Sequence, residues 1–313
     1  MKDFSRLVFG KELISLAESN DFIIFNADTK SCAIEEFGKK YPERNFSFGI
    51  AEQNLIASAA GAARCGEKVY LATFATFASM RACEQVRTFV CYPNVDVTIL
   101  GSHAGLQTGT DGATHISTED ISIMRSFPNM TIVEPSDYVA AKKLARLSLD
   151  FHTPLYIRFP KTATPQIHDE NTYSMKIGVS NLILNYGNDV AIIAMGWILS
   201  WAMEAAEILK GMGINAKVIE MHTVKPLDEE AVIKAAKDTG AVVTIEDHTI
   251  LGGLGAAVSE VLGENIPTYM QRVGVLDRFG VSGEPKFLYE ENNMTVSDII
   301  SACKKVIAKK ESK

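Results

Sequence analysis

The chain has 313 residues, of which 47% are hydrophobic and 22% are charged, a composition typical of globular proteins with sizeable cores. Its formal net charge of −7 argues against a nucleic-acid partner and against binding to an anionic membrane, since both select for clustered Lys and Arg. The length exceeds the roughly 100–200 residues of an ordinary domain and predicts two domains.

The cysteines and the apolar segments indicate a cellular compartment. The five cysteines are odd in number and show no CxxC spacing, which is typical of reduced thiols in a cytosolic protein. The N-terminal segment MKDFSRLVFGKELISLAES is amphipathic and lacks the continuous apolar core of a signal peptide. No apolar run elsewhere reaches the roughly 18 residues of a membrane span. We therefore expect a cytoplasmic protein with no membrane partner.

Strand and helix patterns alternate along the chain. In the first half, the predicted strands are Phe22–Asn26, Val69–Ala72, Val95–Leu100, Met130–Val133 and Leu155–Arg158, and the predicted helices are Glu52–Arg64, Ser79–Phe89 and Tyr138–Leu149. In the second half, the strands are Asp189–Ala194, Ala216–Glu220, Ala241–Ile245 and Thr268–Val273, and the helices are Ser200–Met212, Asp228–Ala236, Gly255–Leu262 and a terminal helix from Val296. Such alternation predicts an α/β fold with mostly parallel sheets covered by helices.

The two sets of elements are separated by a segment without clear periodicity. Pro160, Pro165 and polar residues cluster there, as is usual in connecting segments. We therefore predict two α/β domains, residues 1–160 and 188–313, joined by a linker at residues 161–187.

A polar, glycine-rich segment, SHAGLQTGTDGATH, follows the predicted strand VDVTIL. In an open α/β sheet, the loop that leaves the carboxyl end of a strand is where ligands bind. His103, Asp111 and His115 supply titratable groups on this loop, which favours a functional site. A zinc site is one alternative, although the two histidines lie far apart and have no Cys partner. An ordinary turn at Asp111 and Gly112 is another.

Glu52 and a nearby aromatic stripe have structural as well as functional interpretations. Glu52 opens a predicted helix in FGIAEQN, where the helix dipole stabilises an acid whatever its function. Phe74, Phe77 and Met80 follow one another at intervals of three residues in TFATFASMR, a spacing typical of a helix core. These patterns alone leave both interpretations open.

Several motifs in order resemble one known family. The set FGIAEQN, TFATF, H-x7-D-x3-H, PNMTIVEPSD, PLYIRFPK and TIEDHTILGGLG is similar to the C-terminal half of transketolase, from about Arg6 to the end of the chain. The resemblance implies a pyrimidine-binding domain followed by a transketolase-type C-terminal domain, with thiamine diphosphate as cofactor. It also implies transfer of a two-carbon ketol unit from a ketose phosphate to an aldose phosphate through a carbanion on that cofactor.

The resemblance assigns cofactor contacts to five residues. Glu52 would be catalytic and contact N1′ of the aminopyrimidine, because a carboxyl group shielded from water can share a proton with that nitrogen. Phe74 and Phe77 would stack on the aminopyrimidine ring. Met80 stands where familiar transketolases often have Tyr, which leaves the pocket apolar but changes its shape. Asp28, at a strand end, would approach the cofactor, and a helix cap is the alternative.

The same resemblance assigns substrate contacts. His103 and His115 match histidines that hold the donor ketose and assist proton transfers, and Asp111 matches an aspartate that binds a substrate hydroxyl. Arg158 matches an arginine that binds the sugar phosphate, and Arg6 would do the same, because guanidinium groups suit phosphate. A surface salt bridge is the alternative for Arg158. No residue is assigned to a metal.

The family binds the diphosphate and its magnesium through a Gly-Asp-Gly motif in a separate N-terminal domain, and this sequence contains no GDG. The glycines of LGGLG are weak evidence for phosphate binding. The resemblance therefore implies half of a split transketolase, whose N-terminal subunit supplies the diphosphate and magnesium site in a complex with two copies of each subunit. Three alternatives stay open: a deoxyxylulose-phosphate synthase-like enzyme, a 2-oxoacid dehydrogenase β-type subunit, and a noncatalytic dimerisation partner.

Overall fold

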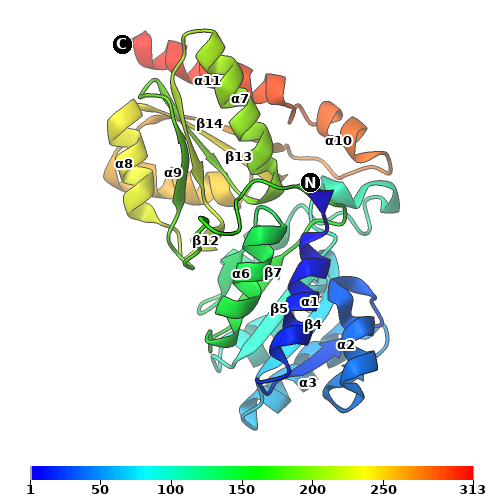
Figure 1. Ribbon diagram of the computed structural model, residues 1–313. Helices are drawn as coiled ribbons and strands as arrows, with labels where there is room; N and C mark the ends of the chain where they lie inside the picture. Colours follow the sequence, from blue (N-terminus) through cyan, green and yellow to red (C-terminus); the bar gives the residue numbers. More distant parts are fainter. Residues whose placement is uncertain (1, 313) are drawn as a thin grey trace.

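The computed structural model describes residues 2–312 and contains two large sheets, one below the other in Figure 1. The strands of the first sheet are, in spatial order, β12 (Thr223–Lys225), β6 (Thr131–Val133), β7 (Leu155–Arg158), β5 (Val97–Ser102), β4 (Val69–Phe74), β2 (Ile23–Asn26) and β3 (Asn45–Ser47). Those of the second are β14 (Tyr269–Val275), β13 (Ala241–Thr249), β10 (Val190–Ala194), β11 (Ala216–Glu220) and β9 (Asn181–Asn185).

Both sheets are mostly parallel. Among the strand pairs within residues 2–312, only the edge pair of β12 with β6 is antiparallel in the first sheet, and only the edge pair of β9 with β11 in the second. A separate short pair joins β1 (Lys2–Asp3) to β8 (Thr164–Pro165). The predicted α/β class with mostly parallel sheets covered by helices is confirmed.

Helices cover both sheets on both faces (Figure 1). On the first sheet, α1 (Ser5–Leu16), α2 (Ile34–Lys40) and α6 (Tyr138–Leu149) share one apolar core, while α3 (Glu52–Arg64), α4 (Cys83–Gln85) and α5 (Asp120–Arg125) lie on the other face. On the second sheet, α7 (Leu199–Gly211) and α11 (Val296–Glu311) pack together, opposite α8 (Glu229–Thr239) and α9 (Leu254–Asn265). The short α10 (Pro285–Glu291) contacts the loop that follows β5.

The apolar core continues from one sheet to the other. Leu55 on α3 and Val69 on β4 belong to the same buried cluster as Ile193 on β10 and Val258 on α9. The two halves are therefore packed against each other through apolar contacts, which fixes how their strand ends face one another.

Some elements differ from the sequence prediction. The predicted helix Ser79–Phe89 is a longer irregular stretch, with π-type turns at Phe77–Arg81 and Val86–Cys91 on either side of α4. Such π turns are frequent near functional sites. Asn181–Asn185, which the prediction placed in the linker, forms the edge strand β9, and β12 from the second half extends the first sheet.

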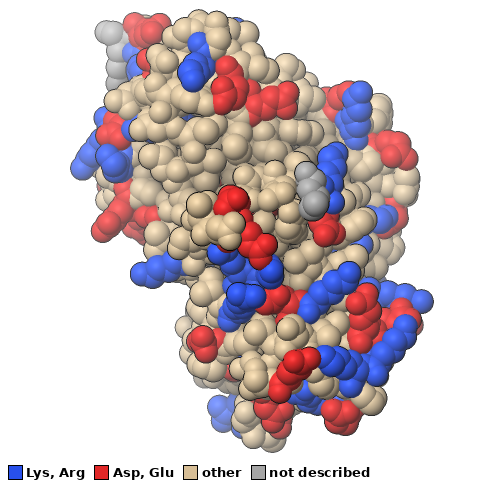
Figure 2. Space-filling view, viewed as in Figure 1, with Lys and Arg blue, Asp and Glu red and all other residues tan. Residues whose placement is uncertain are grey.

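Charged side chains of both signs are intermixed on the face drawn in Figure 2, and a broad area of other residues covers its upper part. Within residues 2–312, no helix combines the length and apolarity that crossing a bilayer requires.

Candidate functional site

Four aromatic rings gather where β4 and β5 end. The two strands are parallel neighbours, with Phe74 opposite Ser102, so the residues that follow them meet at one edge of the sheet. The ring of Phe74 lies 4.2 Å from that of His103 and 5.9 Å from those of Phe77 and His115, and the rings of Phe77 and His115 are 5.3 Å apart. The structure thus brings together four residues that the sequence analysis selected from separate motifs.

His103 is held in a defined position and is neutral at physiological pH. Its backbone is in the left-handed region at φ +60°, its carbonyl accepts a hydrogen bond from the Thr108 hydroxyl at 2.6 Å, and its Nδ1 lies 3.1 Å from Ser102 Oγ. Burial is the main reason that the pKa of His103 falls to about 4, and the positive charges of Arg6 and Lys161 lower it further. A neutral imidazole can accept a proton and can also donate one.

Two cations and one carboxylate lie close to this histidine. Lys161 Nζ contacts Asp111 Oδ1 at 2.7 Å and donates to the Thr108 carbonyl at 3.3 Å. Arg6 Nε donates to the Lys161 carbonyl at 3.3 Å. Lys161 was not selected from the sequence, although it is the last residue of the quoted motif PLYIRFPK. Its position beside Asp111 and Arg6 makes it part of the candidate site.

Glu52 is buried and paired, unlike most acids in a first helical turn. Its side chain is 2% exposed at the first residue of α3, and Oε2 accepts a hydrogen bond from Arg81 Nη1 at 2.8 Å. The Arg81 guanidinium lies 4.1 Å from the ring centre of Phe77, within the range of a cation–π interaction. Arg81 therefore connects the carboxylate to the aromatic cluster. The sequence analysis missed it, although it directly follows Met80 in the quoted TFATFASMR.

Met80 and Asp28 lie at the surface. The Met80 side chain is 40% exposed, and its sulfur accepts a hydrogen bond from the Thr76 hydroxyl at 3.7 Å. Asp28 is exposed with φ +56°, and its N–H donates to Asn26 Oδ1 at 3.1 Å. The alternative that Asp28 caps a helix is wrong, because the helical segments that follow it receive no side-chain cap.

Arg158 requires a correction. It is 1% exposed, and its Nε and Nη1 donate to Asp120 and Glu134, each at 2.9 Å. Its Nη2 donates to the backbone carbonyls of Ser117 at 3.1 Å and Asp247 at 2.7 Å. The guanidinium is committed to these buried partners, so neither the expected phosphate contact nor the alternative surface salt bridge describes it.

Burial shapes the charge states around Arg158. Burial raises the pKa of Glu134 to about 7, against the lowering effect of the Arg158 charge. For Asp120, burial would raise the pKa, but the Arg158 charge and hydrogen bonds outweigh it and hold that pKa below its ordinary value. Arg158 thus links the two halves of the molecule, because it binds Asp120 and Glu134 in the first half and the Asp247 carbonyl in the second.

The glycine amides of LGGLG are also occupied. At the start of α9, the Glu246 carboxylate accepts hydrogen bonds from Leu254 N at 2.6 Å and Gly255 N at 2.8 Å. A carboxylate from the chain itself thus fills the helix N-terminus where a phosphate could have bound. Residues 2–312 hold no group of three His, Cys, Asp or Glu side chains arranged to bind a metal ion.

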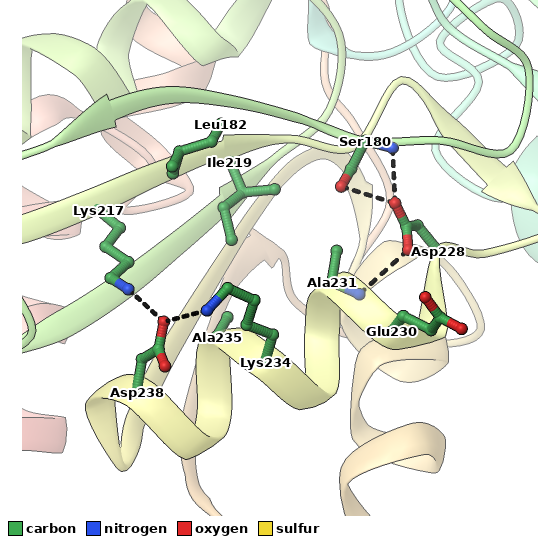
Figure 3. A pocket seen from close by; sticks show the side chains of 10 residues that line it. All are labelled: Ser180, Leu182, Lys217, Ile219, Asp228, Glu230, Ala231, Lys234, Ala235 and Asp238. Carbon is green, nitrogen blue, oxygen red and sulfur yellow. Dashed lines mark hydrogen bonds and ion pairs between the residues drawn. The ribbon is translucent and has the colours of Figure 1, made fainter.

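A separate hollow of about 330 Å³ lies between β9, β11 and α8 (Figure 3). Its Lys217 pairs with Asp238 at 2.5 Å, and Lys234 pairs with the same carboxylate at 3.2 Å. Its Asp228 accepts hydrogen bonds from Ser180 and from the N–H of Ala231. These charged groups satisfy one another, so the aromatic cluster is the stronger candidate site.

Both halves of the chain are similar to known proteins. The family profile described as "Transketolase, pyrimidine binding domain" matches residues 5–166, and "Transketolase, C-terminal domain" matches residues 181–299. The chain is 42% identical to the putative transketolase C-terminal section of Methanocaldococcus jannaschii, over 88% of this chain and 87% of that one. It is 40% identical to the 6-deoxy-6-sulfo-D-fructose transketolase subunit of Clostridium sp. strain MSTE9, over 95% and 92%.

Among solved structures, one described as "Split gene transketolase, inactive beta4 tetramer" is similar over nearly the whole chain. It has a TM-score of 0.89 at 37% sequence identity and covers 97% of this chain and 98% of its own.

Proposed function

The chain belongs to the transketolase family, and we propose that it is the C-terminal subunit of a split transketolase. In this proposal it transfers a two-carbon ketol unit from a ketose phosphate to an aldose phosphate, together with an N-terminal subunit. The observation that supports it most directly is the cluster of Phe74, Phe77, His103 and His115 beside the buried carboxylate of Glu52.

The residues present fit the aminopyrimidine end of thiamine diphosphate. The rings of Phe74 and Phe77 are tilted 37° to each other with centres 5.9 Å apart, and such faces suit a flat heterocycle. Glu52 is shielded from water and would hold the proton that the ring nitrogen N1′ requires. When bound, the cofactor supplies the nucleophilic carbon for the transfer. We assign its diphosphate and magnesium to the partner subunit, because this sequence lacks the GDG motif.

The polar residues near the rings would bind the sugar. A neutral His103 can accept and return a proton at a substrate hydroxyl or carbonyl oxygen, and His115, whose ring lies against the same two phenylalanines, can share this task. Asp111 would accept a hydrogen bond from a sugar hydroxyl. Arg6 and Lys161, in place of Arg158, would bind the phosphate, because both carry positive charge close enough to His103 to lower its pKa.

Reconstitution tests the proposal. The chain is mixed with a separately purified N-terminal transketolase subunit that carries the GDG motif, and ketol transfer is measured with thiamine diphosphate and magnesium. We expect activity only in the mixture, from a complex with two copies of each subunit by mass. Activity of this chain alone would refute the need for a partner. A stable but inactive complex would favour a noncatalytic role.

A further inference from the structure

One carboxylate of the second sheet, Asp247, contacts the loop after β5 that leads from His103 to His115. Asp247 stands near the carboxyl end of β13 and is buried. Its Oδ1 accepts a hydrogen bond from Leu106 N at 2.9 Å, and its Oδ2 accepts from the Tyr289 hydroxyl at 2.5 Å and from Trp197 Nε1 at 3.3 Å. The Asp247 side chain thus joins the loop after β5 to two aromatic residues of the second half.

The loop is shaped around this carboxylate at Gly105. Gly105 has φ +68°, and a Cβ atom on it would lie 2.3 Å from the Asp247 carboxyl group. Its N–H donates to the Ser117 carbonyl at 2.8 Å, which closes the loop on itself. Only glycine combines this backbone conformation with so close an approach.

The far end of the loop is tied to the same strand. Thr249 N on β13 donates to the Thr118 carbonyl at 2.8 Å, and Arg158 Nη2 bridges the carbonyls of Ser117 and Asp247. His103 and His115 therefore lie on or beside a segment whose two ends are both fixed by β13.

We infer that Asp247 is a positioning residue, which fixes the Gly105–Leu106 turn and thereby the placement of His103 and His115 against Phe74 and Phe77. This inference rests on the proposed function for its catalytic consequence. It gives Asp247, which belongs to the motif TIEDHTILGGLG of the second half, a role in the chemistry of the first half. Misplacement of a catalytic group by about 1 Å can cost about 100-fold in rate, so the effect is measurable.

The variants are chosen to break this contact in different ways. Asp247→Ala removes the acceptor for all three donors, whereas Asp247→Asn keeps the volume and one carbonyl oxygen for Leu106 N. Gly105→Ala disrupts the same contact from the loop side, because the added Cβ would clash with the Asp247 carboxyl group. Asp238→Asn, in the same half but in the partly buried pair with Lys217, is the matched control for loss of a carboxylate.

Two measurements do not require enzymatic activity. Hydrogen exchange in the full chain should become at least about tenfold faster in peptides spanning residues 103–118 in Asp247→Ala, with α3 and β4 unchanged. The six histidines can be followed by NMR, and the pKa of His103 should rise from about 4 towards its ordinary value as the loop loosens and water enters. Asp238→Asn should change neither.

In the reconstituted enzyme, kcat/KM should fall about 10- to 100-fold in Asp247→Ala and its acid limb should move to higher pH, with partial rescue in Asp247→Asn. Unchanged exchange and an unchanged His103 titration in soluble Asp247→Ala would overturn the inference. If that variant does not fold, the same results in Gly105→Ala would overturn it. Failure of ketol transfer in the unmodified complex would instead count against the proposed function, since the exchange and NMR results stand without it.

Discussion

Replacing Arg158 with alanine should destabilise the fold. The change removes a fully buried guanidinium from Asp120 and Glu134 and leaves two backbone carbonyls without their donor. Breaking a buried ion pair by removing one partner costs about 3–5 kcal/mol, because the other charge stays buried without compensation. That is a large share of the roughly 5–15 kcal/mol that stabilises an ordinary domain.

The loss should depend on pH. Without the cation, the pKa of Asp120 in the folded protein should rise above its value in the unfolded chain, and the pKa of Glu134, which burial already raises, should rise further, so the folded state binds more protons. Stability then falls as pH rises. The deficit relative to the unmodified protein should therefore be larger at about pH 8 than at about pH 6, since Glu134, with a pKa of about 7, can be neutral at the lower value.

Urea unfolding followed by circular dichroism measures this effect. A loss of this size should lower the urea midpoint by about 1–2 M. Arg146→Ala is the matched control, because Arg146 pairs with Glu12 and its side chain is 61% exposed; such pairs contribute about 0–1 kcal/mol. A stable Arg158→Ala variant with a raised KM only for phosphorylated sugars would refute this reasoning and restore the phosphate-binding role.

Three further predictions concern the proposed reaction. Glu52→Gln should lower kcat about 100- to 10,000-fold and leave the free energy of unfolding unchanged. The control Glu35→Gln, on an exposed helical turn, should have no effect on kcat, and full turnover of Glu52→Gln would contradict the proton-holding role. Lys161→Met should raise KM for ketose phosphates about 10-fold and leave KM for unphosphorylated ketoses unchanged. Equal effects on both KM values would count against phosphate binding by Lys161. Because the pKa of His103 is about 4, kcat/KM should show no acid limb from this group near pH 6.5 and should fall only as pH approaches 4. An acid limb near pH 6.5 that disappears in His103→Asn would refute the low pKa of His103.

Local patterns predicted most of the fold but not the long-range pairings that complete the site. The helix at Glu52–Arg64 and the strand at Leu155–Arg158 were predicted at the bounds that the structure shows, because both have clear periodicity or apolar runs. Arg6 meets Lys161 next to the place where β1 pairs with β8, across more than half of the chain. Such a pairing of two-residue strands leaves no periodic signal in the sequence.

Arg158 and Lys161 show why residue type and strand position do not separate structure from function. Arg158 is the last residue of β7 and Lys161 follows that strand, so both lie at the carboxyl end of a strand, where ligands usually bind in α/β folds. The second sheet packs over Arg158 and supplies the Asp247 carbonyl to it, so its charge is used for folding. Lys161, three residues later, is 30% exposed beside Asp111, so its charge is accessible to an anion. The two substitutions should therefore give opposite results, with Arg158→Ala changing the urea midpoint and Lys161→Met changing KM.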